Sequence, residues 1–444
     1  MGQQKIMFVV GSSSEVSLLN PIWEELRRQG TEGIINCSTG APTQEGSSQG
    51  PNGALRALGM PFRTLRDYGT MDITEVLKAE QPDVVVVGSD QEFLKRAFVC
   101  AANSLRIPTL SFLLGIMSNA SNVPRIALKR TIYRLTHRPI NILHKYLYLL
   151  RTMAGSGWSP FEILRAVIDD IRMAFSVDDA EGRFGCRAIA VAGSWDMRVL
   201  IERGVDPDKI FVTGSPTLGA LSQVGGSPDT TLLRQDLGID TQTRVILLLT
   251  GSHVEHGHWS PDMRSRFITG IIDSLAPLLG KSTCLVVKIH PVENLHDYQR
   301  IVGDGRERVM LRKDLRLSDI VSLSDVVIAG YSTTVLEAGI LRKPVILLSI
   351  FDEPVLFPYV EMGLATGVYH LGDLRAAVET ILDDPSAREE ALSKADLFLS
   401  QNRRSFDGKA PARIADLILD MAGSRPSARR ESWDESCEIS KEAC

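Results

Sequence analysis

Residues 324–348 read SDVVIAGYSTTVLEAGILRKPVILL, and this stretch decides the fold. The apolar run 325–329 predicts a strand that ends at Gly330. The hydroxyl-rich residues 331–334 then open a segment with helical spacing, and 345–348 predict the next strand. Uninterrupted Val, Ile and Leu runs indicate strands covered on both faces, which is typical of a parallel sheet.

The same order of strand, loop and helix recurs along the chain. Helical segments separate the further predicted strands, which are 5–10, 83–87, 109–114, 210–213, 244–250 and 284–289. Two such blocks predict an α/β protein of two Rossmann-like, doubly wound domains. We place them at 1–215 and 216–422, with a basic helical insertion at about 121–175 in the first. We expect the last helix to return to the first domain and the polar tail 423–444 to be disordered.

Composition excludes several classes of protein. The 444 residues are 44% hydrophobic and 23% charged, as in ordinary globular proteins. A net charge of -5 argues against a general nucleic-acid binder. Six cysteines without a CxxC pair indicate neither a zinc site nor a disulfide framework, and they suit the cytoplasm. The opening MGQQKIMFVV reads as a strand, and no apolar run approaches the roughly 20 residues that span a bilayer.

The loop and helix start at Tyr331, Ser332, Thr333 and Thr334 form the strongest candidate site. Free backbone N–H groups and hydroxyls at a helix start can bind a phosphate or diphosphate. Glu337 follows within a turn, where a carboxylate can accept hydrogen bonds from ribose hydroxyls. The alternative is plain N-capping by Ser332 with a solvated Glu337.

Histidines follow two other strands of the second domain. His290, in LVVKIHPVEN, can contact a phosphate or act as an acid, or it can simply cap a loop. The loop 251–258 reads GSHVEHGH, and we expect Ser252 or His253 to contact a ligand. A metal site in this loop is the weaker alternative, because its histidines lack helical i, i+4 spacing and no cysteine joins them.

The first domain offers two further loops. Asp90 ends the strand DVVVV and is a candidate base for an acceptor hydroxyl, or else the N-cap of the next helix. The small residues Gly11 and Ser12 let a ligand approach the backbone, and a serine here can cap the following helix. No GxGxxG motif is present, so we expect no nicotinamide or flavin cofactor.

A local charge imbalance marks the first domain. No acidic residue lies between Glu92 and Glu162, whereas basic residues accumulate there, Arg130, Arg134 and Arg138 among them. A basic amphipathic segment can lie on an anionic membrane surface or bind a lipid-linked acceptor. The alternative is a solvated helical insertion packed on the domain.

In this order the motifs resemble those of the UDP-N-acetylglucosamine 2-epimerase family and of the glycosyltransferases that share its two-domain GT-B fold. The opening VVGSSSEVSLLNPIWEEL matches at Gly11 and Glu15, and PDVVVVGSD puts Asp90 at the family's catalytic aspartate. KIFVTGSPTLGAL resembles the segment leading into the second domain and adds Gly214 to the nucleotide-sugar site. The resemblance implies diphosphate binding by Ser332 and Thr333 and ribose binding by Glu337.

The departures from the epimerases favour a transferase. Leu113 stands where they carry a glutamate, and Ser252, beside His253, stands where they carry a histidine. A leucine cannot move a proton. The motifs KIHP and YSTT also look like those of GT-B enzymes that build capsules and teichoic acids.

The resemblance therefore predicts a cytoplasmic GT-B glycosyltransferase of surface-polysaccharide synthesis, peripheral to the membrane. A nucleotide sugar, UDP-linked by resemblance, would bind the second domain, and a glycan or lipid-linked acceptor would enter from the first. No metal or other cofactor is expected, because helix-dipole and His290 contacts would stabilise the leaving diphosphate. The alternatives are an epimerase, hydrolysing or not, and a non-catalytic nucleotide-sugar-binding subunit.

Overall fold

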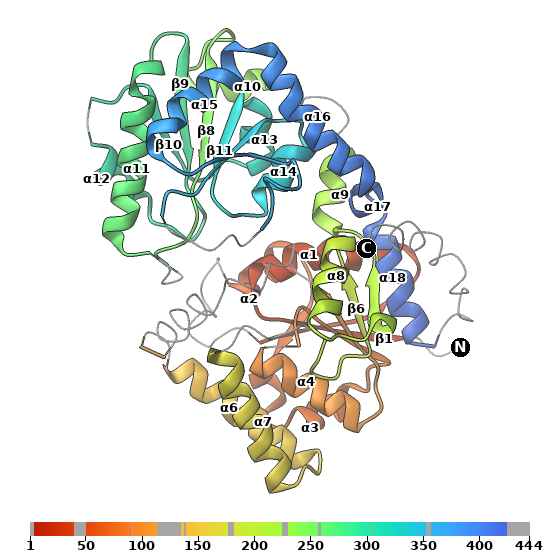
Figure 1. Cartoon of the computed structure of the whole chain (residues 1–444). Coiled ribbons are helices and arrows are strands. Elements are labelled where there is room, and N and C mark those ends of the chain that lie inside the picture. The colour runs from red at the N-terminus through yellow and green to blue at the C-terminus, as the bar shows by residue number, and fades with distance from the viewer. Residues whose placement is uncertain are drawn as a thin grey trace.

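Two parallel sheets, each with helices on both faces, make up the protein in the computed structural model (Figure 1). The structure describes residues 4–39, 50–90, 92–112, 135–136, 139–175, 182–223, 230–255, 259–303, 305–351 and 357–423. The predicted architecture of two Rossmann-like domains is confirmed.

The first sheet has the strand order β3-β2-β1-β4-β5-β6-β7, and every neighbouring pair is parallel. Its strands are β1 (Lys5–Val10), β2 (Gly33–Ser38), β3 (Phe62–Thr64), β4 (Val84–Val87), β5 (Thr109–Phe112), β6 (Ala188–Val191) and β7 (Ile210–Val212). The side chains of β4 are all buried, as its VVVV sequence predicts.

The second sheet has the order β10-β9-β8-β11-β12-β13, again parallel throughout. Its strands are β8 (Arg244–Leu249), β9 (Thr283–Lys288), β10 (Val309–Arg312), β11 (Val326–Ala329), β12 (Val345–Leu348) and β13 (Thr366–Val368). Five strands that the sequence reading missed are β2, β3, β6, β10 and β13. Three of these, β3, β10 and β13, lie at sheet edges, where a strand has neither two partners nor a long apolar run.

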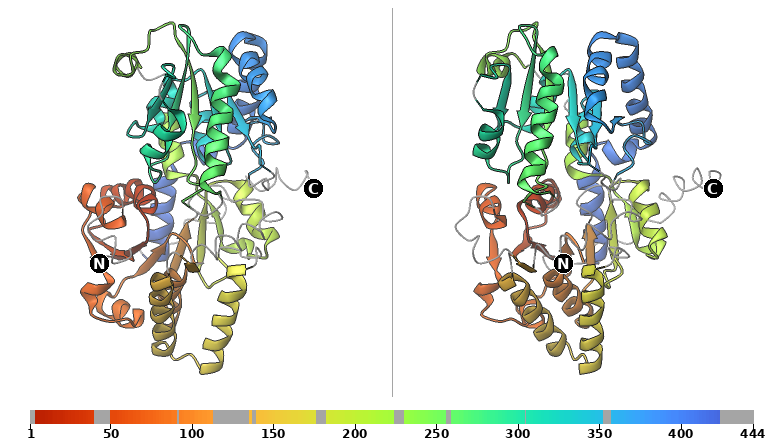
Figure 2. Two further views of the ribbon diagram at one scale, coloured as in Figure 1. Left: turned by 90° about the vertical axis from the view of Figure 1, so that its left-hand side faces the viewer. Right: turned by 60° about the vertical axis from the view of Figure 1, so that its left-hand side comes forward.

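Helices cover both faces of each sheet (Figure 2). Those before the second sheet are α1 (Ser13–Arg28), α2 (Pro51–Ala57), α3 (Ile73–Glu80), α4 (Phe93–Ser104), α6 (Pro139–Gly155), α7 (Pro160–Phe175), α8 (Ser194–Glu202) and α9 (Pro216–Gln223). Those that follow are α10 (Thr231–Leu237), α11 (Pro261–Leu275), α12 (Leu295–Val302), α13 (Leu317–Leu323), α14 (Thr334–Ile340), α15 (Leu371–Asp383), α16 (Pro385–Gln401), α17 (Arg403–Phe406) and α18 (Ala410–Met421).

The last helix packs on the first sheet. Ile414 and Ile418 of α18 are buried in one apolar cluster with Phe8 of β1 and Ile22 of α1 (Figure 1). The chain thus crosses between the sheets twice, once before α9 and once before α18. The predicted tail, 423–444, lies outside the described residues apart from Gly423.

Strand order in each sheet reverses around the domain's first strand. The reversal lies between β1 and β4 in the first sheet and between β8 and β11 in the second. Ligands of open α/β sheets bind beyond the carboxyl ends of the strands at such a switch point. The loops after these four strands carry predicted motifs, and His290 follows β9, the neighbour of β8.

The predicted basic insertion is helical where it is described. Helix α6 packs beside α4 and α3, and α7 packs on α6. The other part of the insertion, with Arg130, Arg134 and Arg138, lies outside the described residues, as does Leu113. No helix among the described residues is long and apolar enough to cross a bilayer.

Candidate functional site

The switch point of the second sheet gathers three predicted loops. Strands β9, β8 and β11 are neighbours, so the loops that follow them start side by side. His253 lies over the ends of two of these strands. A Cβ atom on Gly251 would come 2.6 Å from His253 Nε2, and one on Gly330 would come 3.9 Å from it. Glycine at 251 therefore makes room for the imidazole.

The His253 ring is held by an aromatic stack. It lies nearly parallel to Trp259, with ring centroids 4.2 Å apart and planes 17° apart. Trp259 in turn meets Phe351 edge-on at 5.1 Å. Because the ring is fixed by packing, its orientation toward the strand ends is set before any ligand arrives.

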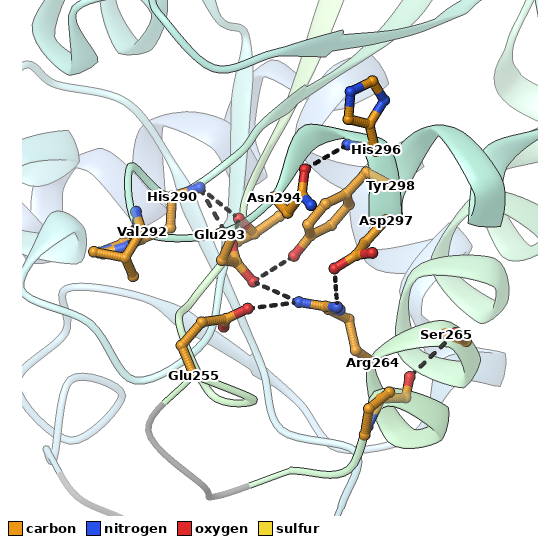
Figure 3. Close-up of polar contacts among 12 residues, drawn as sticks. Glu255, Arg264, Ser265, His290, Val292, Glu293, Asn294, His296, Asp297 and Tyr298 are labelled. Atoms are coloured by element: carbon orange, nitrogen blue, oxygen red, sulfur yellow. Dashed lines mark hydrogen bonds and ion pairs between the residues drawn. The ribbon is translucent and has the colours of Figure 1, made fainter. Parts of the chain in front are cut away.

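His290 directly follows β9 and Ile289, as predicted. Its backbone N–H donates to Thr250 Oγ1 at 2.9 Å and to Glu293 Oε2 at 3.2 Å (Figure 3). The Val292 N–H donates to His290 Nδ1 at 3.4 Å. An accepting Nδ1 favours the neutral tautomer with hydrogen on Nε2, which can donate to a phosphate oxygen.

A buried carboxylate supports the His290 loop. Glu293 is 1% exposed, and its Oε1 accepts the Tyr298 hydroxyl at 2.6 Å. Its Oε2 accepts both the Thr250 hydroxyl and the His290 N–H. Burial raises the pKa of Glu293, against the opposing effect of these hydrogen bonds. The sequence reading missed Glu293, although it follows His290 by three residues.

Arg264 completes this network (Figure 3). Its buried guanidinium donates to Glu255 at 2.9 Å and to Asp297 at 2.7 Å, and it lies 3.9 Å from Glu293 Oε1. Glu255 thus has a cationic partner, which counts against the metal alternative for its loop. Residues 256–258 lie outside the described ones, and the described residues hold no group of three metal-ligating side chains.

The start of α14 differs from simple capping by Ser332. Thr333 is the N-cap, without a side-chain capping bond, and Ser332 Oγ accepts the Thr334 N–H only at 3.4 Å. The Thr334 hydroxyl oxygen is buried and has no hydrogen-bond partner among the residues that the structure describes. Tyr331 packs against the apolar cluster beneath the helix. The Thr334 hydroxyl therefore keeps an unused hydrogen-bonding capacity at the start of α14.

Glu337 lies against the first domain. It lines a pocket of about 80 Å³ together with Thr333 of its own helix start. Trp195 of α8 and Asn402, between α16 and α17, line the same pocket. Burial raises the pKa of Glu337 to about 7. The alternative of a fully solvated Glu337 is therefore wrong.

The switch point of the first sheet is built around Glu15. Its Oε2 accepts the N–H groups of Gly11 at 2.5 Å and of Ser12 at 3.3 Å, and Ser12 Oγ caps α1 by accepting the Glu15 N–H. The capping role predicted for a serine is thus confirmed. Glu15 also forms an ion pair with Lys95 of α4, and both side chains are buried. Gly88 adjoins this pair, since a Cβ atom there would overlap the Glu15 carboxylate.

Asp90 does not have the surroundings predicted for an acceptor base. It is fully buried, and its two carboxylate oxygens accept the N–H groups of Gly182 at 2.8 Å and Phe184 at 3.2 Å. Burial raises its pKa. Nor is it the N-cap of α4, which is Glu92. Asp90 therefore fastens the segment before β6 to the end of β4.

Gly214 has a packing role, and its predicted nucleotide contact stays a prediction. Its φ is +93°, which favours glycine, and a Cβ atom would come 3.0 Å from the Arg404 carbonyl oxygen and 3.1 Å from Ala410 Cβ. Ser215 beside it donates its N–H to the Ser405 carbonyl. The glycine thus lets the two crossings between the sheets pack together.

Comparison with protein families finds a match in the second half of the chain. Residues 200–420 match the family model of CDP-glycerol:poly(glycerophosphate) glycerophosphotransferase. No curated protein matched the sequence.

Solved structures share the fold at low sequence identity. UDP-GlcNAc 2-epimerase from Neisseria meningitidis bound to UDP-GlcNAc is 17% identical, with a TM-score of 0.59 over 94% of this chain and 100% of that one. The wall teichoic acid polymerase TagF is 12% identical, with a TM-score of 0.54 over 95% and 89%. The calicheamicin glycosyltransferase CalG4 is 16% identical, with a TM-score of 0.52 over 95% and 99%. The predicted GT-B fold and transferase class are confirmed.

Proposed function

Residues 200–420 match the glycerophosphotransferase family model, and from this similarity we propose a specific reaction. The enzyme transfers a glycosyl unit from a nucleotide diphosphate-linked donor to a hydroxyl of a glycan or lipid-linked acceptor. This places it in the synthesis of surface polysaccharides. The donor's nucleotide half binds the second domain, and the acceptor enters from the first.

One observation carries the proposal. The switch point of the second sheet presents His253 and His290 on neighbouring loops, with the hydroxyl-bearing start of α14 after the next strand. Two imidazoles and the Thr334 hydroxyl offer hydrogen-bond donors to diphosphate oxygens. Glu337, within a turn of Thr334, accepts hydrogen bonds from the ribose hydroxyls.

His290 has the surroundings needed to assist the leaving group. When the acceptor hydroxyl attacks the sugar carbon, the bond from that carbon to the diphosphate oxygen breaks, the hydroxyl proton passes to solvent, and negative charge grows on the diphosphate. A hydrogen-bond donor fixed at that place stabilises the developing charge more than the ground state. Ser252 contributes beside His253. The reaction as proposed uses no metal ion or other cofactor.

The family match supports a second candidate reaction, in which the transferred unit is glycerol phosphate. The acceptor would then attack phosphorus, and a nucleoside monophosphate would leave. Glycosyl transfer releases a nucleoside diphosphate instead. The released nucleotide therefore separates the two reactions, whatever the acceptor.

The test combines donor binding with product analysis. We expect UDP-linked sugars to raise the melting temperature and, with a glycan acceptor, to release UDP. Release of CMP from CDP-glycerol would support the second candidate. Free N-acetylmannosamine formed from UDP-N-acetylglucosamine without acceptor would refute the transferase proposal in favour of epimerisation.

A matched pair of variants tests the site itself. Thr334→Val removes the unpaired hydroxyl, and we expect donor affinity to fall about tenfold, as for one lost charge-assisted hydrogen bond. Thr380→Val makes the same change on the exposed side of α15 and should leave affinity unchanged. Equal affinities for both variants would exclude Thr334 from the donor site.

We propose further that the enzyme works at the cytoplasmic face of the membrane. The acid-free stretch between Glu92 and Glu162 supports attraction to anionic lipids or to an anionic acceptor. Neutralising Arg130, Arg134 and Arg138 should weaken liposome binding. Unchanged binding would exclude these three residues from the contact.

A further inference from the structure

Helices α6 and α7 each expose a row of large apolar side chains. The exposed residues recur every three or four positions, so each row runs along one side of its helix. They are Ile140, Leu143 and Leu147 on α6, and Phe161, Leu164, Ile168 and Ile171 on α7. Exposure is 70% at Ile140 and 75% at Phe161. We call these seven residues the apolar hairpin surface.

The opposite sides of both helices are anchored in the first domain. Leu149 and Met153 of α6 are buried in the cluster beneath α4. Asp170 of α7 is buried and forms an ion pair with Arg96 of α4. The apolar rows therefore face away from the domain, and Figure 1 shows the hairpin at the end of the molecule remote from the second sheet.

A basic row flanks the apolar hairpin surface on each helix. Four positions beyond an apolar residue, hence beside it on the helix, lie the cations Arg151 on α6 and Arg165 and Arg172 on α7, and the imidazole of His144 on α6. All four side chains are exposed. An apolar stripe bordered by cations is the pattern of helices that lie in a membrane interface.

Glu162 and Asp169 of α7 offset the charge of Arg165 and Arg172, so the net positive charge of the hairpin comes from Lys145 and Arg151 of α6. Asp170 is buried with Arg96, and the Glu162 carboxylate accepts hydrogen bonds from the Ser159 N–H and hydroxyl at the helix start. Asp169 lies 4.0 Å from Arg172, an exposed pair of small energetic weight. Helix α6 has no acidic residue at all.

We propose that the apolar hairpin surface inserts into the headgroup region of an anionic lipid bilayer. The inference rests on the peripheral association proposed above and locates it on described residues. Trp158, 37% exposed in the turn between the helices, is suited to the interface. A second copy is the poorer occupant, because two apposed α6 helices would bring Lys145 and Arg151 of each copy together, and these cations would repel one another.

The test is vesicle cosedimentation of the full chain. We expect binding to vesicles containing phosphatidylglycerol and much weaker binding to phosphatidylcholine alone. The triple variant Leu143→Ser, Phe161→Ser, Leu164→Ser should lower partitioning at least tenfold, because each side chain loses its apolar burial in the interface. The control Leu232→Ser, Leu397→Ser removes comparably exposed leucines from α10 and α16 and should bind as the unmodified chain does.

A second triple variant tests the contribution of the basic residues beside the apolar hairpin surface. Arg151→Gln, Arg165→Gln and Arg172→Gln together should weaken the preference for phosphatidylglycerol while leaving the apolar rows intact. Binding that is unaffected by either triple variant would overturn the proposal. So would a dimer of the unmodified chain that the serine variant converts to a monomer, since the surface would then be covered by a second copy.

A measurement of donor binding distinguishes a failure of this proposal from a failure of the proposed function. The serine variant should retain the thermal stabilisation by a nucleotide sugar, because its substitutions lie far from the second sheet. Vesicle binding without any nucleotide stabilisation would refute the donor site alone. Nucleotide stabilisation without vesicle binding would refute the membrane surface alone.

Discussion

Tyr298 donates its hydroxyl to Glu293 Oε1 over 2.6 Å, behind the loop that carries His290. This hydrogen bond fixes the buried Glu293 carboxyl group close to the end of β9. Since Glu293 Oε2 accepts the His290 N–H, the position of the imidazole depends on a carboxylate that no ligand needs to touch.

Glu293→Gln should destabilise the protein by about 1–3 kcal/mol, because an amide nitrogen facing hydroxyl and N–H donors cannot accept their hydrogens. Tyr298→Phe removes one hydrogen bond and should cost about 1 kcal/mol. Urea unfolding measures both. If Glu293→Gln were as stable as the unmodified chain, Glu293 would not be the acceptor that organises this loop.

Glu337→Gln should change stability in a pH-dependent way. The folded-state pKa of about 7 lies above the ordinary value of 4.5, so the folded state binds this proton more tightly than the unfolded state. The native chain therefore loses stability as pH rises from 4.5 toward 7. We expect Glu337→Gln to gain about 2 to 3 kcal/mol relative to the native chain between pH 5 and pH 8. The control Glu390→Gln, at an exposed ion pair with Lys394, should show no such gain. A pH-independent difference would refute the raised pKa.

Lys95→Met should cost about 3–5 kcal/mol, because it leaves the buried Glu15 carboxylate without its cation. The double variant Glu15→Gln, Lys95→Met should recover much of that loss. A double-mutant cycle in urea measures the coupling. Additive effects would show that the two side chains do not act as a pair.

Gly251→Ala and Gly330→Ala form a matched comparison around His253. The first places a methyl group 2.6 Å from Nε2, so the ring must leave its stack on Trp259, at a cost of about 1–3 kcal/mol. The second places it at 3.9 Å, an ordinary contact, and should change stability by less than about 0.5 kcal/mol. Unfolding curves and tryptophan fluorescence distinguish the two. Equal costs would mean that His253 is not held over Gly251.

The sequence was sufficient to predict the central strands and the loops that follow them. Apolar runs such as 84–87 and 326–329 are long enough to identify strands buried on both faces, and switch-point geometry then brings their loops together. Strand β2, whose sequence GIINCS mixes polar and apolar residues, lacks such a signal.

Side-chain partners distant along the chain could not be predicted. Asp90 resembled a catalytic residue, but the backbone that it binds lies 92 and 94 residues further on. Glu293 was overlooked for the same reason, since Thr250 and Arg264 meet it only in the folded sheet. A single sequence gives the residue types but does not show which distant residues come into contact in the fold.

The return of α18 to the first sheet has a consequence for synthesis. Phe8 and Ile22 remain without one of their packing partners until Ile414 and Ile418 have been made. Domains generally fold as units while the chain emerges, N-terminal part first. Here the first domain must wait for nearly the whole polypeptide, so the second domain, begun later, is able to finish folding earlier.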